Sequence, residues 1–138
     1  MIRYYAEGTD LPDFCQTTVT GWIKRVISSH GKLPGEINYI FCNDERILSV
    51  NIEFLKHDYY TDIITFDYSK SSVLSGDIYI SLDTVASNAT KLDLPFSNEL
   101  NRVMVHGILH LCGFKDKKPD ESLEMRKLED DALEILKA

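Results

Sequence analysis

Residues 106–116 read HGILHLCGFKD, and they are the part of the chain that makes its chemistry specific. His106 and His110 are four residues apart, so a helix places both imidazoles on one face, one above the other. Gly113 predicts the end of that helix, because glycine readily adopts the left-handed conformation that turns the chain back. Asp116 then lies in a loop that returns toward the histidines. The spacing indicates a metal site with three protein ligands: His106, His110 and Asp116.

The segments around this helix alternate between strand and helix patterns. β-Branched and aromatic residues or apolar alternation predict strands at 2–7, 36–42, 61–68 and 76–82. Apolar periodicity predicts helices from about Pro12 to Ser29, and at 43–55, 83–92, 97–113 and 120–136, with a turn at Pro34-Gly35. We therefore expect an α+β fold in a single domain, residues 1–138, with a small mixed sheet of about four strands packed with about five helices.

Composition restricts the class of protein. A chain of 138 residues with 43% hydrophobic content can bury the core of one ordinary domain. Its apolar runs are far shorter than the ~20 residues that cross a bilayer, and its start lacks the pattern of a secretory signal. We expect a cytoplasmic protein with no membrane segment. Cys15, Cys42 and Cys112 are odd in number and form no CxxC pair, which favours reduced, mostly buried thiols.

Net charge constrains how the protein meets a nucleic acid. The formal charge of −7 argues against a protein that coats nucleic acid through its overall field, because such proteins usually carry a basic excess. It does not exclude an enzyme whose cleft holds a cation and attracts one phosphodiester. The net charge therefore restricts the affinity for nucleic acid more than it restricts the class of function.

The pattern HxxxHxxGxxD resembles the HExxHxxGxxH motif of the metzincin zinc proteases, so the expected helix is metzincin-like. A bare HxxxH pair is more often structural, but Gly113 and Asp116 at this spacing favour a metal site. Gly107 stands where the proteases carry the glutamate that acts as general base. Peptide hydrolysis by that route would lack its proton acceptor.

The same segment closely follows HGxLHLxGYDH, the signature of the YbeY endoribonucleases. TDIITF at 61–66 is similar to the TDVLSF strand of that family, and GDIYIS at 76–81 is similar to its GDIxIS strand. Residues 48–54, with Asn51, resemble the helix that precedes these strands. Together the similar segments cover about two thirds of the chain and occur in the same order, which makes the resemblance specific.

The resemblance implies a metal-dependent endoribonuclease that acts on single-stranded RNA. It also implies a role in ribosomal RNA maturation, at the 3′ end of the small-subunit rRNA, and in ribosome quality control. The implied cofactor is one Zn²⁺ per chain, with another divalent ion as the alternative. The implied partners are RNA, ribosomal RNA, and the small ribosomal subunit or its assembly factors. The oligomeric state is not indicated.

The chain departs from the family pattern at two places. Lys115 and Asp116 stand where the family has aspartate and histidine, so the third ligand is a carboxylate, which zinc accepts. Leu55 aligns with the arginine that the family carries in the helix before TDVLSF. The phosphate contact of that arginine must then come from Lys56, Arg102 or Lys115, or be missing. Arg102 and Lys115 are the residues we predict for catalysis, as phosphate contacts.

Two other functions stay open. HxxxHxxGxxD alone suggests a metalloprotease, and Leu55 keeps open a non-catalytic ribosome-assembly factor in which a metal only ties the helix to its following loop. Asp62 and Asp77 either orient a ligand histidine or cap the ends of strands. Lys117 belongs to a lysine cluster that either attracts phosphate or keeps the loop solvated. His57 has no evident partner and is not predicted as a ligand.

Overall fold

Four strands form one mixed sheet in the order β1-β2-β4-β3. The computed structural model describes residues 1–137, in which the strands are β1 (Ile2–Glu7), β2 (Leu33–Cys42), β3 (Ile63–Asp67) and β4 (Val73–Ser81). β1, β2 and β4 run parallel, whereas β3 is antiparallel to β4 and pairs Ile63 with Ile80. β3 therefore forms one edge of the sheet.

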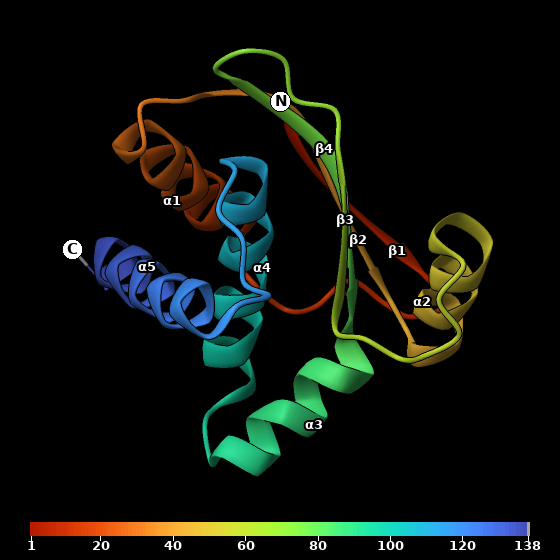
Figure 1. Cartoon of the computed structure of the whole chain (residues 1–138). Helices are drawn as coiled ribbons and strands as arrows, with labels where there is room; N and C mark the ends of the chain where they lie inside the picture. The colour runs from red at the N-terminus through yellow and green to blue at the C-terminus, as the bar shows by residue number, and fades with distance from the viewer. Residues whose placement is uncertain (138) are drawn as a thin grey trace.

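Helices cover both faces of this sheet (Figure 1). α1 (Gln16–Ser29), α4 (Phe96–Leu111) and α5 (Pro119–Lys137) lie on one side, and α2 (Asp44–Val50) lies on the other. α2 continues into a π-helical turn, Asn51–Leu55, and α3 (Leu82–Leu92) extends from the end of β4. The five α-helices and four strands of residues 1–137 confirm the predicted α+β fold.

α4 lies between the sheet and the outer helices. Its Met104 and Ile108 are fully buried, as are Ile78 and Ile80 on β4. The Tyr39 hydroxyl of β2 donates a hydrogen bond to the Met104 carbonyl at 2.8 Å. Burial on both sides holds α4 in one orientation relative to the sheet.

Gly107 is a point of close approach between α4 and the sheet. A Cβ atom at this position would lie 3.0 Å from Ile78 Cγ2 and 3.1 Å from Ile63 Cδ1. These distances are shorter than ordinary carbon–carbon contacts, so only glycine fits without displacing its neighbours. The glycine faces the sheet, and the protein has no room at this position for the glutamate that metzincin proteases carry.

The start of the first helix and one turn differ from the sequence prediction. α1 begins at Gln16 rather than near Pro12, because Phe14 packs edge-on against Tyr4 of β1 at 5.1 Å while the chain is still non-helical. The turn predicted at Pro34-Gly35 is wrong. Both residues lie in β2, and Gly31, with φ of 72°, lies where the chain turns between α1 and β2. β2 tolerates Pro34 because β1 pairs with β2 only from Ile37 onward.

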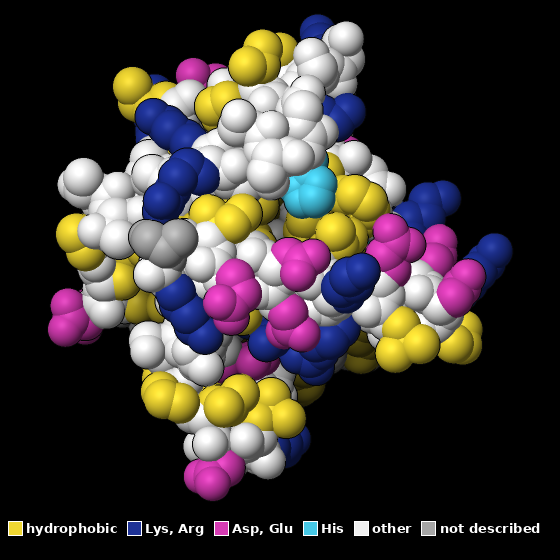
Figure 2. All heavy atoms as spheres, turned by 90° about the vertical axis from the view of Figure 1, so that its left-hand side faces the viewer, with side chains coloured by type: hydrophobic (Ala, Val, Ile, Leu, Met, Phe, Trp, Pro, Cys, Tyr) yellow, Lys and Arg dark blue, Asp and Glu magenta, His cyan; other side chains and the backbone are white. Residues whose placement is uncertain are grey.

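The surface carries mixed charge. On the face shown in Figure 2, acidic and basic side chains are interspersed rather than gathered into one basic patch. Among residues 1–137, none of the helices is both long enough and apolar enough to cross a membrane. The thiols match expectation in part, since Cys42 is buried and Cys112 half-buried but Cys15 is exposed.

We expect Gly107→Ala to destabilise the protein by roughly 1 kcal/mol, because overpacking a tight contact costs about 1–3 kcal/mol and the gain in helix propensity offsets about 1. Gly21→Ala in α1 is the matched control, since nothing lies within 4 Å of a Cβ added there. That variant should be neutral or slightly more stable. Urea unfolding of both variants measures the difference, and equal effects would contradict the close approach at Gly107.

Candidate metal centre

Three side chains converge where α4 ends. His106 Nε2 and His110 Nε2 lie 2.9 Å apart, and Asp116 Oδ2 lies 3.2 Å from the first and 3.6 Å from the second. A tetrahedral ion with bonds of about 2.0–2.2 Å holds its ligand atoms roughly 3.3–3.6 Å apart. The three atoms predicted from the sequence therefore have nearly the spacing that one small metal ion requires.

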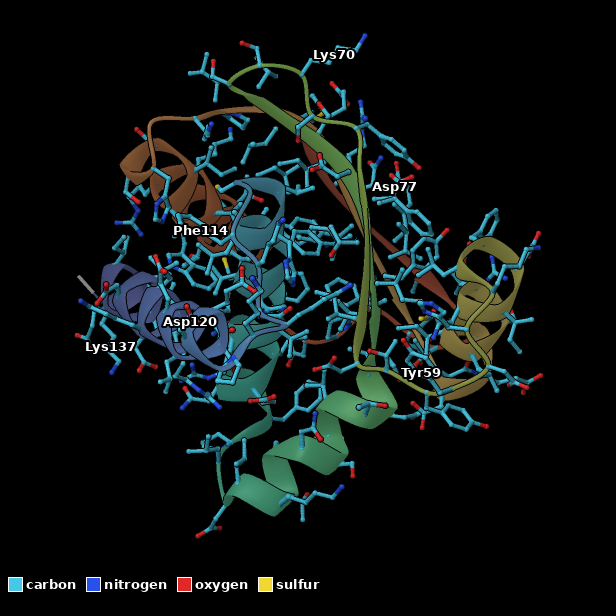
Figure 3. The ribbon with its side chains drawn as sticks, in the orientation of Figure 1. Tyr59, Lys70, Asp77, Phe114, Asp120 and Lys137 are labelled. Atoms are coloured by element: carbon cyan, nitrogen blue, oxygen red, sulfur yellow. The ribbon has the colours of Figure 1, made fainter. Side chains whose placement is uncertain are left out.

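The end of α4 brings the aspartate back to the histidines. Gly113 follows the helix with φ of 103°, a conformation that side chains other than glycine rarely adopt. The reversed chain then places the Phe114 carbonyl 3.0 Å from His110 Nδ1, and the Phe114 ring packs edge-on against His30 at 5.3 Å, beside α1 (Figure 3). This loop positions Asp116 beside both imidazoles.

Hydrogen bonds at Nδ1 determine which nitrogen of each histidine has a lone pair available to bind a metal ion. A carbonyl oxygen only accepts, so His110 Nδ1 must donate its proton to Phe114. His106 Nδ1 donates to the Glu129 carboxylate at 2.6 Å. In the neutral rings both Nε2 atoms then carry lone pairs, and they face each other and Asp116. Such an arrangement favours a cation between them, and the donor set fits a divalent metal.

The protonation of the two rings is asymmetric. Burial acts to lower the pKa of His106, but the hydrogen bond and charge of Glu129, with Asp116, raise it overall. Burial and the neighbouring His106 both lower the pKa of His110. The surroundings therefore make His106 the more readily protonated of the two rings.

Glu129 of α5 is a functional residue that sequence reasoning missed. It is buried, and its second oxygen accepts a hydrogen bond from Arg102 at 3.0 Å. Burial acts to raise the pKa of Glu129, but the hydrogen bonds from His106 and Arg102 lower it overall, so the carboxylate stays ionised. Its signal in the sequence is a carboxylate on the buried face of a helix, between Met125 and Ala132.

The structure does not place Arg102 and Lys115 beside the three converging atoms. The guanidinium of Arg102 pairs with Glu129 at 3.0 Å and Asp130 at 2.9 Å. Lys115 lines a separate cavity with Glu121. Their role as phosphate contacts stays a prediction, and the geometry gives Arg102 a direct structural partner instead.

The two aspartates differ in position. Asp62 lies beside His106 and Glu129 in a cavity of about 170 Å³, and its burial raises its pKa. Asp77 precedes Ile78 on β4, so it points to the other face of the sheet, where it accepts a hydrogen bond from Asn38 at 3.0 Å (Figure 3). Only Asp62 is near enough to influence a ligand histidine.

A larger cavity, of about 440 Å³, opens beside the converging atoms. His110, Asp116 and Lys117 line it from the α4 side, and residues of the 51–59 segment line it from the α2 side. It thus extends across the edge strand β3. His57 is part of this lining, which sequence reasoning did not anticipate.

We expect Arg102→Ala to lower the free energy of unfolding of the metal-free protein by about 2 kcal/mol, because it removes the nearest guanidinium partner of the buried Glu129 carboxylate. Asp130→Ala is the control, because Asp130 is 57% exposed and its pair with Arg102 should contribute less than about 1 kcal/mol. Urea unfolding in the presence of a chelator measures both. Unchanged stability of Arg102→Ala, together with weaker RNA binding, would favour the phosphate-contact role.

Comparison with known proteins identifies the family of the chain. The family model for Endoribonuclease YbeY matches residues 6–137. A relative from Phocaeicola vulgatus named endoribonuclease YbeY is 54% identical over 136 residues, covering 99% of each chain. One of the same name from Flavobacterium psychrophilum is 48% identical over 120 residues, covering 87% of this chain and 86% of the relative.

The fold is also similar to a solved structure. The solution structure of a Thermotoga maritima protein matches with a TM-score of 0.70 at 26% identity, covering 99% of this chain and 89% of that one. The similarity of sequence and of fold extends over nearly the whole chain. The chain belongs to the endoribonuclease YbeY family.

Proposed function

We propose that this protein is a metal-dependent endoribonuclease that cleaves single-stranded RNA. The observation that carries the proposal is the convergence of His106 Nε2, His110 Nε2 and Asp116 Oδ2 within 3.6 Å of one another. The names of its relatives support the reaction, because they are called endoribonucleases. His106, His110 and Asp116 would hold the ion.

The proposed ion is one Zn²⁺ per chain. Two imidazoles and one carboxylate, with ligand atoms at this spacing, suit a zinc site that leaves a fourth position for water or substrate. A carboxylate in the third position also makes the site more tolerant of harder ions than three imidazoles would be. A different divalent ion in place of zinc is therefore the alternative cofactor.

The ion would polarise a phosphoryl oxygen and lower the pKa of a coordinated water, and the protein supplies the rest. Glu129 and the Phe114 carbonyl orient the two imidazoles through their Nδ1 protons. The cavity beside Asp116 gives a phosphodiester access to the site. Gly107, packed on the sheet, offers no general base, which disfavours the metzincin-type protease.

The proposed substrate in the cell is ribosomal RNA, at the 3′ end of the small-subunit rRNA, with roles in maturation and quality control of the ribosome. The family relationship supports this proposal, and from it we also infer a cytoplasmic location and, as partners, the small subunit or its assembly factors. A chain of net charge −7 would recognise RNA locally, at the ion and Lys117, rather than through its overall field.

We expect His106→Ala to lose bound metal and to lower RNA cleavage by at least about 100-fold, because one of three ligands and the partner of Glu129 are removed together. Leu123→Ala is the control, since Leu123 is 74% exposed on α5. Element analysis and cleavage of a labelled single-stranded oligoribonucleotide are measured on the same preparations.

The same preparations separate the alternative functions. Cleavage of an unstructured protein, with no cleavage of RNA, would favour the metalloprotease. Neither cleavage, together with normal rRNA processing in cells that carry His106→Ala, would favour the non-catalytic assembly factor.

We expect Asp116→His to keep the metal but to change its preference toward zinc and away from harder ions. Replacing a carboxylate with a neutral imidazole raises the net charge at the ion, so a coordinated water becomes more acidic. The pH dependence of cleavage should therefore move to lower pH. An unchanged pH profile and unchanged metal content would show that Asp116 is not a ligand.

A further inference from the structure

We propose that His57 binds a phosphate of the RNA strand, through its Nε2–H group, in the cavity next to the metal centre. The inference rests on the proposed function, because it assigns a second contact to the same substrate. Neither the motif nor the ligand spacing indicates His57, which lies about fifty residues earlier in the chain.

The loop that carries His57 is held by one buried side chain. α2 ends in the π-helical turn Asn51–Leu55, and Lys56, with φ of 60°, turns the chain back. The backbone N–H of His57 then donates to the Asn51 carbonyl at 3.1 Å, and Asn51 Nδ2 donates to the Tyr59 carbonyl at 2.9 Å. Asn51 is 2% exposed, so both hydrogen bonds are anchored in the interior. The loop is built to hold residues 57–59 in one place.

Tyr59 orients the imidazole. The two rings stack at 5.2 Å with an interplanar angle of 18°, and the Tyr59 hydroxyl lies 3.0 Å from His57 Nδ1. Figure 3 shows Tyr59 on the loop that leads from α2 toward β3. A phenol O–H is a stronger donor than an imidazole N–H, so we assign the hydroxyl as donor to Nδ1 and the ring proton to Nε2. His57 therefore presents an N–H donor to a partner outside the loop.

His57 and the metal centre line one cavity. Its lining includes His110 and Asp116 as well as His57, and its volume of about 440 Å³ is in the range of small-ligand sites. The charged groups on its lining are Lys117, Asp67 and Asp116. A phosphodiester at the ion has its neighbouring phosphates along the same strand, and an N–H donor is what a phosphate oxygen requires.

His57 also supplies a hydrogen-bond donor for phosphate that other residues of the site do not provide. Leu55 lines the cavity but has no donor, and Arg102 is engaged by Glu129 and Asp130. Apart from the proposed ligand His110 and the buried Asn51, the side-chain nitrogen donors on the cavity lining belong to His57 and Lys117. Of these two, His57 is the one that hydrogen bonds hold in position.

The test separates a phosphate donor from a merely structural ring. His57→Phe keeps an aromatic ring to stack on Tyr59 but removes the donor, and His57→Gln keeps an N–H donor without the ring. We expect His57→Phe to lower kcat/KM for a single-stranded oligoribonucleotide by about 10- to 100-fold, with unchanged metal content, and His57→Gln to recover part of the loss. Tyr60→Ala, an exposed residue of the same loop outside the cavity lining, should match the wild type.

A second measurement does not depend on cleavage. Uridine 5′-monophosphate, added to the zinc-loaded wild-type protein, should shift the ring NMR signals of His57, and His57→Phe should bind it several-fold more weakly. If His57→Phe cleaves RNA like the wild type and the monophosphate leaves the ring signals unmoved, the inference is overturned. If the wild type cleaves no RNA but the monophosphate shifts His57, the proposed function fails and the phosphate site stands.

Discussion

The close packing of α4 on the sheet at Gly107 is the constraint on which the site depends. With no side chain at this position, the helix lies directly against Ile78 and Ile63, and its flanking histidines emerge beside the edge strand β3. A larger residue would push the helix away from the sheet and move both imidazoles with it. Because the same contact excludes a glutamate, the packing that places the metal ligands also removes the general base of a metzincin. One contact, at Gly107, therefore restricts both the position of α4 and the side chains available for catalysis.

The two histidines are oriented by different kinds of partner. The Phe114 carbonyl belongs to the loop that carries Asp116, so the orientation of His110 follows directly from the local chain reversal at Gly113. Glu129 comes from α5, and the hydrogen bonds of His106 and Arg102 lower its pKa and keep it ionised. The orientation of His106 consequently depends on the docking of a helix that is distant in sequence. Binding of an ion between the two rings would stabilise the docked α5, because it favours the tautomer that Glu129 accepts from.

The sequence predicted local features well and distant ones poorly. Helical spacing and a glycine stop placed His106, His110 and Asp116 together, because a single helix and its cap determine their geometry. Glu129 could not be paired with His106 from the sequence, since helix packing brings them together across 23 residues. His57 was missed for a similar reason. Its position depends on a π-helical turn and on the buried Asn51, which no apolar periodicity reveals.

The metal centre also explains how an acidic chain can act on RNA. Asp116 and Asp67 on the cavity lining would repel a phosphodiester, with only Lys117 and the His57 donor to oppose them. A divalent ion adds two positive charges at the convergence point, which reverses the sign of the local field. RNA affinity would then depend on the ion as strongly as cleavage does. Recognition would then be local, because the charges on the face that Figure 2 shows are interspersed and form no extended basic path there.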